Sequence, residues 1–163
     1  MYSSAQEHSS TQTLQQTYQY WLKIVLVLGA GLYTLLLTQS IAADTLTVVV
    51  SNINKAEGSV MVAVLAGQEG FEDDSIAPAA ALMRPAVSGE MTFIAADLAP
   101  GDYAIRVMHD VNGNGELDAN FIGMPTEPWS MSNNAKGNFG PPTWKDVRFE
   151  IQGDTTQNLE LSK

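Results

Sequence analysis

Apolar and polar residues alternate along most of the chain after residue 44. A period of two places alternate side chains on one face of a β-strand. Six segments show this alternation, and their apolar positions are Leu46, Val48 and Val50; Val60, Val62 and Val64; Met91, Phe93 and Ala95; Tyr103, Ile105 and Val107, followed by His109; Val147, Phe149 and Ile151; and Leu159 and Leu161. A weaker segment, 80–87, is interrupted by Pro85, which predicts an edge or bulged strand.

Turn-forming residues separate these seven segments, and no helical period is visible after the first 43 residues. The pattern predicts an all-β fold, an antiparallel seven-stranded Greek-key β-sandwich of the immunoglobulin or transthyretin kind. The Pro100-Gly101 turn comes just before Tyr103. We therefore expect the Tyr103 ring to pack inside and its hydroxyl to bond nearby backbone, as in the tyrosine corner of such sandwiches.

Residues 1–43 form a different region, which we interpret as an N-terminal leader. An apolar run at 24–37 follows Lys23 and ends in small residues at Ala42 and Ala43. These features are typical of a signal peptide with a helical apolar core, cleaved after one of these alanines. The segment 24–43 is also about long enough to span a bilayer, so an inner-membrane anchor is the alternative. Both interpretations place the domain at 44–163 outside the cytoplasm, periplasmic or secreted.

The formal net charge is −10, and residues 44–163 carry all of it. A sequence-independent nucleic-acid binder needs a surplus of Lys and Arg, so this class is excluded. The chain has no Cys, which excludes disulfide scaffolds, zinc ribbons and cysteine nucleophiles. We interpret the acidic segment 69–74 as a solvated loop around Phe71.

Residues 110–144 show neither the strand nor the helix period. Loops longer than about 12–15 residues are uncommon in compact domains and are usually functional or disordered. The aromatic residues of this segment need burial or a ligand, which favours an ordered functional loop. Its aromatic side chains could stack on a sugar or peptide, or they could pin the loop onto the sheet. The predicted binding residues are His109, Trp129, Asn133, Asn134, Phe139 and Trp144.

The loop opens with a spacing of oxygen-bearing residues that is typical of calcium sites. Positions 1, 3, 5 and 9 hold Asp or Asn, and position 6 is Gly115, which permits a sharp turn. The predicted ligands are Asp110, Asn112, Asn114 and Asp118, with Glu116 binding through its main-chain carbonyl. The spacing therefore predicts calcium as the cofactor.

Position 12, where an EF-hand has a bidentate Glu, is Phe121. A calcium site would need a further carboxylate, and Glu127 and Asp146 are the nearest in sequence. Because Asn-Gly pairs and Asp/Asn side chains also stabilise turns, a metal-free turn is an equal alternative.

His109 is the only His in the predicted exported domain. A hydrolytic role would need a nucleophile and an orienting partner, for which Ser130 and Ser132 are available but share no motif with it. A ring that caps the strand end is the simpler interpretation, so no catalytic residue is assigned.

Several motifs of the loop resemble a known bacterial family. They are His109-Asp110-Val-Asn112-Gly-Asn114-Gly115-Glu116-Leu117-Asp118, Gly123-Met-Pro125-Thr-Glu127, Ser132-Asn133-Asn134-Ala-Lys136-Gly and Phe139-Gly140-Pro141-Pro142, preceded by Pro100-Gly101-Asp102-Tyr103-Ala104-Ile105. Together they resemble the family labelled domain of unknown function 2141, over roughly residues 46–161. The resemblance implies an exported single-domain β-sandwich and brings no established activity.

The sequence thus predicts an exported, non-enzymatic bacterial envelope protein whose 110–144 loop forms a binding surface, organised by calcium. Its expected partner is a small molecule, a glycan or an envelope protein, and not nucleic acid. The alternatives are a small envelope hydrolase that uses His109 and loop carboxylates, and an adhesion or assembly module.

Overall fold

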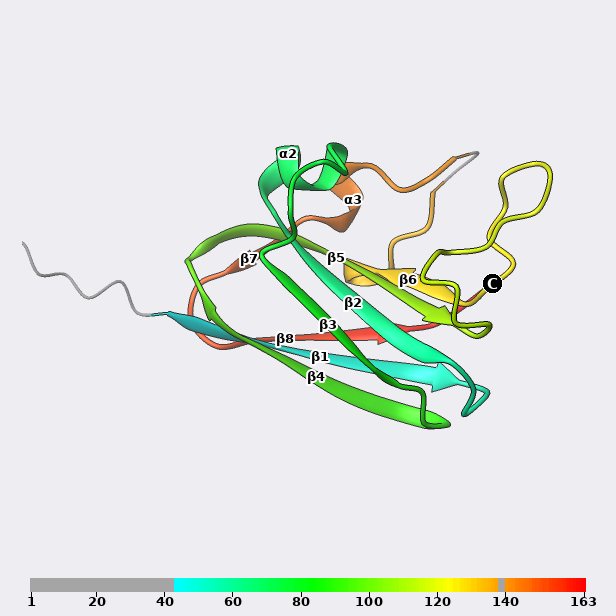
Figure 1. Cartoon of the computed structure of the whole chain (residues 1–163). Coiled ribbons are helices and arrows are strands. Elements are labelled where there is room, and N and C mark those ends of the chain that lie inside the picture. The colour runs from blue at the N-terminus through cyan, green and yellow to red at the C-terminus, as the bar shows by residue number, and fades with distance from the viewer. Residues whose placement is uncertain (1–42, 138–139) are drawn as a thin grey trace, which may run out of the picture. The chain divides into compact units, whose positions relative to one another are not determined.

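Two β-sheets face each other in the computed structural model, which describes residues 43–137 and 140–163 (Figure 1). The first sheet has the order β4-β1-β8, from β1 (Asp44–Ile53), β4 (Gly89–Leu98) and β8 (Thr155–Glu160). The second has the order β3-β2-β5-β6, with β7 also paired to β5; its strands are β2 (Ser59–Ala66), β3 (Ala80–Pro85), β5 (Gly101–Asp110), β6 (Trp129–Met131) and β7 (Phe149–Ile151). The predicted all-β fold with two sheets is confirmed.

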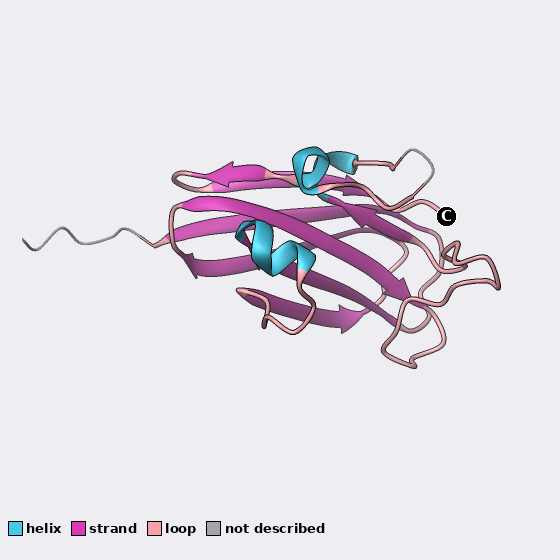
Figure 2. Ribbon diagram, turned by 90° about the horizontal axis from the view of Figure 1, so that it is seen from above, coloured by secondary structure: helices cyan, strands magenta, loops and turns pink. Residues whose placement is uncertain are grey.

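Three short helices accompany the second sheet: α2 (Gly67–Glu72), the 3-10 helix η1 (Ser132–Asn134) and α3 (Trp144–Val147). Helix α2 packs on β2 and β5, and α3 packs on β5 and η1. Figure 2, seen from above, shows α2 and α3 on the near side of the strands. Two of these helices correct the sequence interpretation. The acidic segment begins in a helix rather than a loop, and Val147 ends α3 instead of lying in a strand.

The core lies between the sheets and is built from the side chains that the period of two selects. Every apolar residue of the alternating segments is buried, and all except Val147 belong to this core. Val147 joins a smaller cluster with Leu65, Phe71 and Ala104. The alternation therefore identified the inward faces correctly.

The number and direction of strands differ from the prediction. Eight strands are present in the described residues rather than seven, because β6 lies inside the predicted loop. Strands β1 and β8 run parallel. Both begin at the same end of the sheet, where the Asp154 carboxylate accepts from Thr45 N–H at 3.0 Å and the Asp44 carboxylate accepts from Gly153 N–H at 2.9 Å. These reciprocal bonds join the two strand starts.

Two smaller expectations are confirmed at the sheet edges. β3 pairs with β2 alone, so the segment containing Pro85 is an edge strand. The Tyr103 ring is buried and its hydroxyl donates to the Ala99 carbonyl at 2.7 Å. The tyrosine thus fixes the turn from which β5 enters the core.

The predicted leader helix, signal peptide and anchor at 24–43 lie outside the described residues, except for Ala43. Among the residues that are described, no helix has the length and apolar character needed to cross a membrane.

Candidate functional site

Asp110 ends β5 and organises the loop that follows it. Its carboxylate is buried and accepts three backbone hydrogen bonds: Oδ1 from the N–H groups of Gly113 (2.7 Å) and Asn114 (3.2 Å), and Oδ2 from that of Gly115 (2.8 Å). Gly113 and Gly115 have φ of 78° and 83°, a region that costs other residues about 1–2 kcal/mol. Both Asp110 oxygens are therefore satisfied by the loop's own backbone.

The other predicted ligands of this loop converge on Asp118. The Asn112 amide donates to Asp118 Oδ2 at 2.6 Å, and the Asn114 amide donates to Oδ1 at 3.0 Å. The amide oxygens accept from backbone two residues on, Asn112 from Asn114 N–H and Asn114 from Glu116 N–H, both at 2.9 Å. The spacing thus brings positions 3, 5 and 9 together, while Asp110 at position 1 accepts from loop backbone, in a loop stabilised by Asx turns. The Glu116 side chain is exposed.

Glu127 closes the base of the loop, a role that the sequence only hinted at by proximity. This side chain is buried, with 6% exposed; Oε1 accepts from Val111 N–H at 2.8 Å and Oε2 from Asp118 N–H at 3.2 Å. One carboxylate therefore joins the two ends of the 110–118 segment. Asp146 is used elsewhere: it caps α3 by accepting from the Thr143 hydroxyl (2.6 Å) and N–H (2.9 Å). These bonds lower the Asp146 pKa, the side-chain bond most.

A glycine of the β1–β2 connection lies against the start of this loop. Gly58 lies just before β2, with φ of 68°. A Cβ built there would lie 1.9 Å from the Asp110 carbonyl oxygen and 2.8 Å from that of Val111. The preceding residue, Glu57, offers its carbonyl to His109 Nε2 at 2.8 Å. The tip of the β1–β2 connection thus fits closely against the end of β5.

His109 and the two serines considered for a hydrolytic site each bond to other groups. The ring is 1% exposed, and because Nε2 faces a carbonyl oxygen it carries the proton there. Nδ1 has no hydrogen-bond partner within residues 43–137 and 140–163. Ser132 Oγ bonds to Ile105 N–H and the Val147 carbonyl instead, and Ser130 Oγ donates to Asn134 at 3.4 Å. Within the described residues, neither hydroxyl is paired with the imidazole.

Asn133 and Asn134 join segments that are distant in sequence. The Asn133 amide donates to the carbonyls of Asp146 (3.1 Å) and Arg148 (3.0 Å). The Asn134 amide donates to the Asn158 carbonyl at 2.9 Å and accepts from Glu160 N–H at 2.7 Å. Because β8 is an edge strand, Asn134 covers two backbone groups that would otherwise be unpaired. Both amides are engaged with the protein's own backbone.

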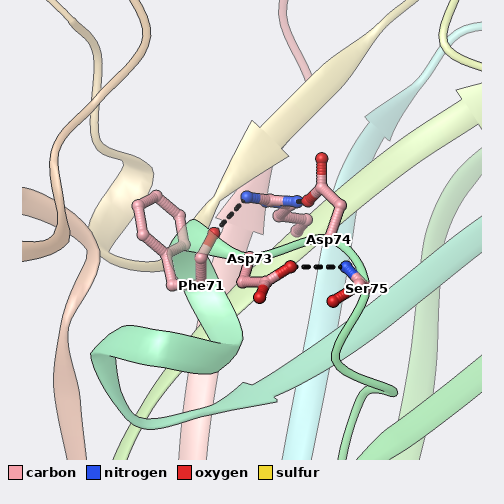
Figure 3. A network of polar contacts seen from close by, with 5 residues as sticks. Phe71, Asp73, Asp74 and Ser75 are labelled. Carbon is pink, nitrogen blue, oxygen red and sulfur yellow. Dashed lines mark hydrogen bonds and ion pairs between the residues drawn. The ribbon is translucent and has the colours of Figure 1, made fainter.

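Trp144 packs in the smaller cluster, with its ring 6.0 Å from that of Phe71. Figure 3 shows the neighbouring contacts: the Phe71 carbonyl accepts a bond, and the Asp73 carboxylate faces Ser75 N–H at 2.9 Å. The donor to Phe71 is Arg106, which also bonds Asp74 at 2.7 Å and lies over the Phe71 ring. Hydrogen bonds from Ser75 lower the Asp73 pKa. These contacts fix α2 on the sheet.

A hollow of about 790 Å³ lies over the outer face of the second sheet. Its floor comprises outward residues of four strands and its rim comes from α2 and the loops. The lining includes Met61, Met83, Met108, Met131, Trp129 and Leu117. Trp129 is half-buried, and its backbone is also bridged to Ser162. Leu117 belongs to the 110–118 loop, so this loop contributes to the rim.

The predicted binding residues are only partly brought together: Trp129 and Asn134 line a second, smaller pocket of about 220 Å³, and the others lie elsewhere. Trp129 borders the hollow, Trp144 packs beneath α2, and His109 lies at the other end of β5 from the helix contacts. Phe139 lies outside the described residues. The methionines of the floor were not predicted as binding residues. The one indication of them in the sequence is that they occupy outward positions in the strand alternation.

No group of three or more His, Cys, Asp or Glu side chains that could hold a metal occurs in the ranges 43–137 and 140–163. The predicted calcium set relies largely on other donors, namely Asn side chains and a main-chain oxygen.

Residues 48–159 match a family described as an uncharacterized protein conserved in bacteria, domain of unknown function 2141. Nothing matches in the comparisons with curated proteins and with solved structures. The match covers most of the chain and includes all the loop motifs. The protein therefore belongs to the domain of unknown function 2141 family, as those motifs predicted.

Proposed function

We propose that this chain is an exported binding protein, in which the sandwich supports a ligand site in the hollow over the second sheet. The observation that carries this proposal is the hollow itself. Its volume of about 790 Å³ falls within the ~300–1,000 Å³ range of ligand pockets, and its lining is mainly apolar, as is usual for them. Rigid strands supply the floor, while loops and α2 supply the rim.

The lining favours a small, uncharged ligand with an apolar or aromatic body. Among the described residues, its charged side chains are Arg106, which is paired with Asp74 and bonds the Phe71 carbonyl, and Glu72, which accepts from Gln68. Trp129 provides a flat ring of the kind that stacks on planar ligands. A glycan is less well matched, because its hydroxyls need more polar partners than this lining provides.

Binding of the neutral dye Nile red to the full-length chain in mild detergent-free buffer tests this proposal. Met83, 65% exposed on edge strand β3, lines the hollow, and Met124, 58% exposed in a loop, does not. We expect Met83→Glu to weaken dye binding at least tenfold and Met124→Glu to leave it unchanged. Equal binding by both variants, or no binding by the parent protein, would refute the proposal.

Calcium at the 110–118 loop is a second candidate, favoured by the convergence of Asn112 and Asn114 on Asp118. For a cation to bind, the Asn112 and Asn114 amides must turn their oxygens toward Asp118, in place of the N–H groups now there. This would cost the two Asx-turn bonds. We therefore propose weak affinity, in the ~10⁻⁴–10⁻³ M range of extracellular modules.

Calorimetric titration with calcium, with Asp118→Asn as the variant and Glu150→Gln as an exposed control, tests the second candidate. We expect heat and a chelator-sensitive rise in melting temperature for the parent and the control only. Absence of both in the parent would eliminate calcium.

The finer fold and export assignments are also proposals. A Greek-key arrangement is supported because β1 pairs with β4 while β2 and β3 lie in the other sheet. Export through a signal peptide, or anchoring through 24–43, is supported by the apolar run after Lys23. Mass spectrometry of the protein recovered from cells distinguishes the two, because cleavage removes the first 42 or 43 residues.

A further inference from the structure

The floor of the hollow contains a row of methionines in register. Met61 of β2 pairs directly with Met83 of β3 on one side and with Met108 of β5 on the other. Met108 in turn pairs with Trp129 of β6. Directly paired residues of an antiparallel sheet have Cβ atoms about 4.5–5.5 Å apart on the same face. Three thioether side chains and an indole therefore stand next to one another across four strands.

The same strands use different residues on their two faces. Their inward positions are mainly β-branched, for example Val60, Val62 and Val107, all buried. The outward positions of the row hold unbranched thioethers instead. β-Branched and aromatic residues are the ones that strands generally favour. The fold itself therefore gives no reason for methionine at three paired outward positions.

A fourth methionine lies beside the row, and the charge of the protein favours a cation. Met131 of β6 pairs with Arg106, which places it diagonally from Met108 and within reach of a long side chain. Met131 also lines the hollow. The formal net charge of −10 favours the approach of cations.

Thioether sulfurs are soft, neutral ligands and select soft metals, of which Cu(I) is the biological example. An indole face beside them attracts a cation through its π-system. We infer that Met61, Met83 and Met108, with Met131 and Trp129 at their side, form a binding site for a soft monovalent cation, Cu(I). This inference rests on the proposed binding role of the hollow and adds a metal site on its floor, separate from the apolar ligand.

Because thioethers do not titrate between pH 5 and 8, binding at this site should be nearly independent of pH. A site that used His109 or carboxylates would lose affinity on acidification, since those ligands must be deprotonated to bind. The row also predicts selectivity: Zn(II), which prefers nitrogen, thiolate and carboxylate ligands, should not compete for it.

The test is an anaerobic Cu(I) titration of the full-length chain against a competing Cu(I) chelator, at pH 7.5 and pH 5.5. We compare the parent, the double variant Met61→Leu/Met108→Leu and the control Met124→Leu. Leucine has nearly the volume and apolar character of methionine, so the variants should fold, which their melting temperatures check. Nile red binding is measured on the same samples.

We expect one Cu(I) per parent chain with affinity changed less than threefold between the two pH values. The double variant should lose at least tenfold in Cu(I) affinity while keeping its dye binding, and Met124→Leu should match the parent. Dye binding without Cu(I) binding in the parent would overturn the metal site alone. If the parent binds neither Cu(I) nor the dye, the proposed function is overturned as well. Equal Cu(I) affinity in the parent and the double variant would also overturn the inference.

Discussion

The 110–118 loop and the methionine row differ in how their side chains are used. In the loop, Asp110, Asn112, Asn114 and Asp118 make hydrogen bonds with one another or with loop backbone. In the row, Met61 and Met108 are only half-buried and Met83 is mostly exposed. Asp and Asn side chains, which suggest a metal site, can thus serve to stabilise a loop. The methionines of the apolar face, by contrast, are accessible to a ligand.

The largest effect is expected from a change that forces the loop away from β2. Gly58→Ala should lower the free energy of unfolding by about 3 kcal/mol, because the new Cβ meets the Asp110 carbonyl at a positive φ. Urea denaturation measures this. The control Gly113→Ala also has a positive φ but no atom within 4 Å, and should cost about 1 kcal/mol. Equal losses would show that the close approach is unimportant.

The next effect concerns Glu127. Glu127→Gln should lower the free energy of unfolding by about 2 kcal/mol. The substitution replaces one of the two acceptor oxygens with an NH₂ group, which cannot accept from the backbone N–H that it faces. The exposed Glu116→Gln is the control and should change stability by less than about 0.5 kcal/mol. Faster hydrogen exchange at Val111 and Asp118 should accompany the loss. Unchanged exchange there would contradict the role assigned to Glu127.

Asn134 offers a smaller test at the edge of the first sheet. Asn134→Ala removes two bonds to β8 and should cost about 1–2 kcal/mol, together with faster exchange at the Glu160 amide. Ligand binding in the hollow should be unchanged, since Asn134 does not line it. A loss of dye binding in a stably folded Asn134→Ala protein would contradict this separation.

The smallest effect is a pH dependence at the cap of α3. The Thr143 bonds lower the Asp146 pKa in the folded protein, so the cap stabilises folding above the unfolded value of about 3.8. This contribution is lost as the pH falls through the lowered value. We expect the Thr143 amide resonance to titrate below pH 3.8 and to stop titrating in Asp146→Asn. A midpoint above 3.8 would have the wrong sign.

The sequence predicted what depends on local spacing. The inward residues of each strand follow from the period of two, and the bonds of Asn112 and Asn114 to Asp118 follow from a tight Asx-rich loop. It did not predict α2 and α3, because six and four residues are too few to show a helical period. The parallel β1–β8 pair and the methionine row were missed because both depend on register between distant segments. Glu127 was named only as a nearby carboxylate, and its role in joining the loop ends was missed because that role requires the chain to return to Val111.

The most direct test of the central claim follows the methionine methyl resonances of the full-length chain, with methyl-¹³C-methionine, during addition of Cu(I) under anaerobic conditions. We predict that the methyl signals of Met61, Met83 and Met108 shift together and saturate at one equivalent, while those of core residue Met91 and loop residue Met124 stay in place. If the signals of the row stay in place, or shift no more than that of Met124, the outer face is not the binding site.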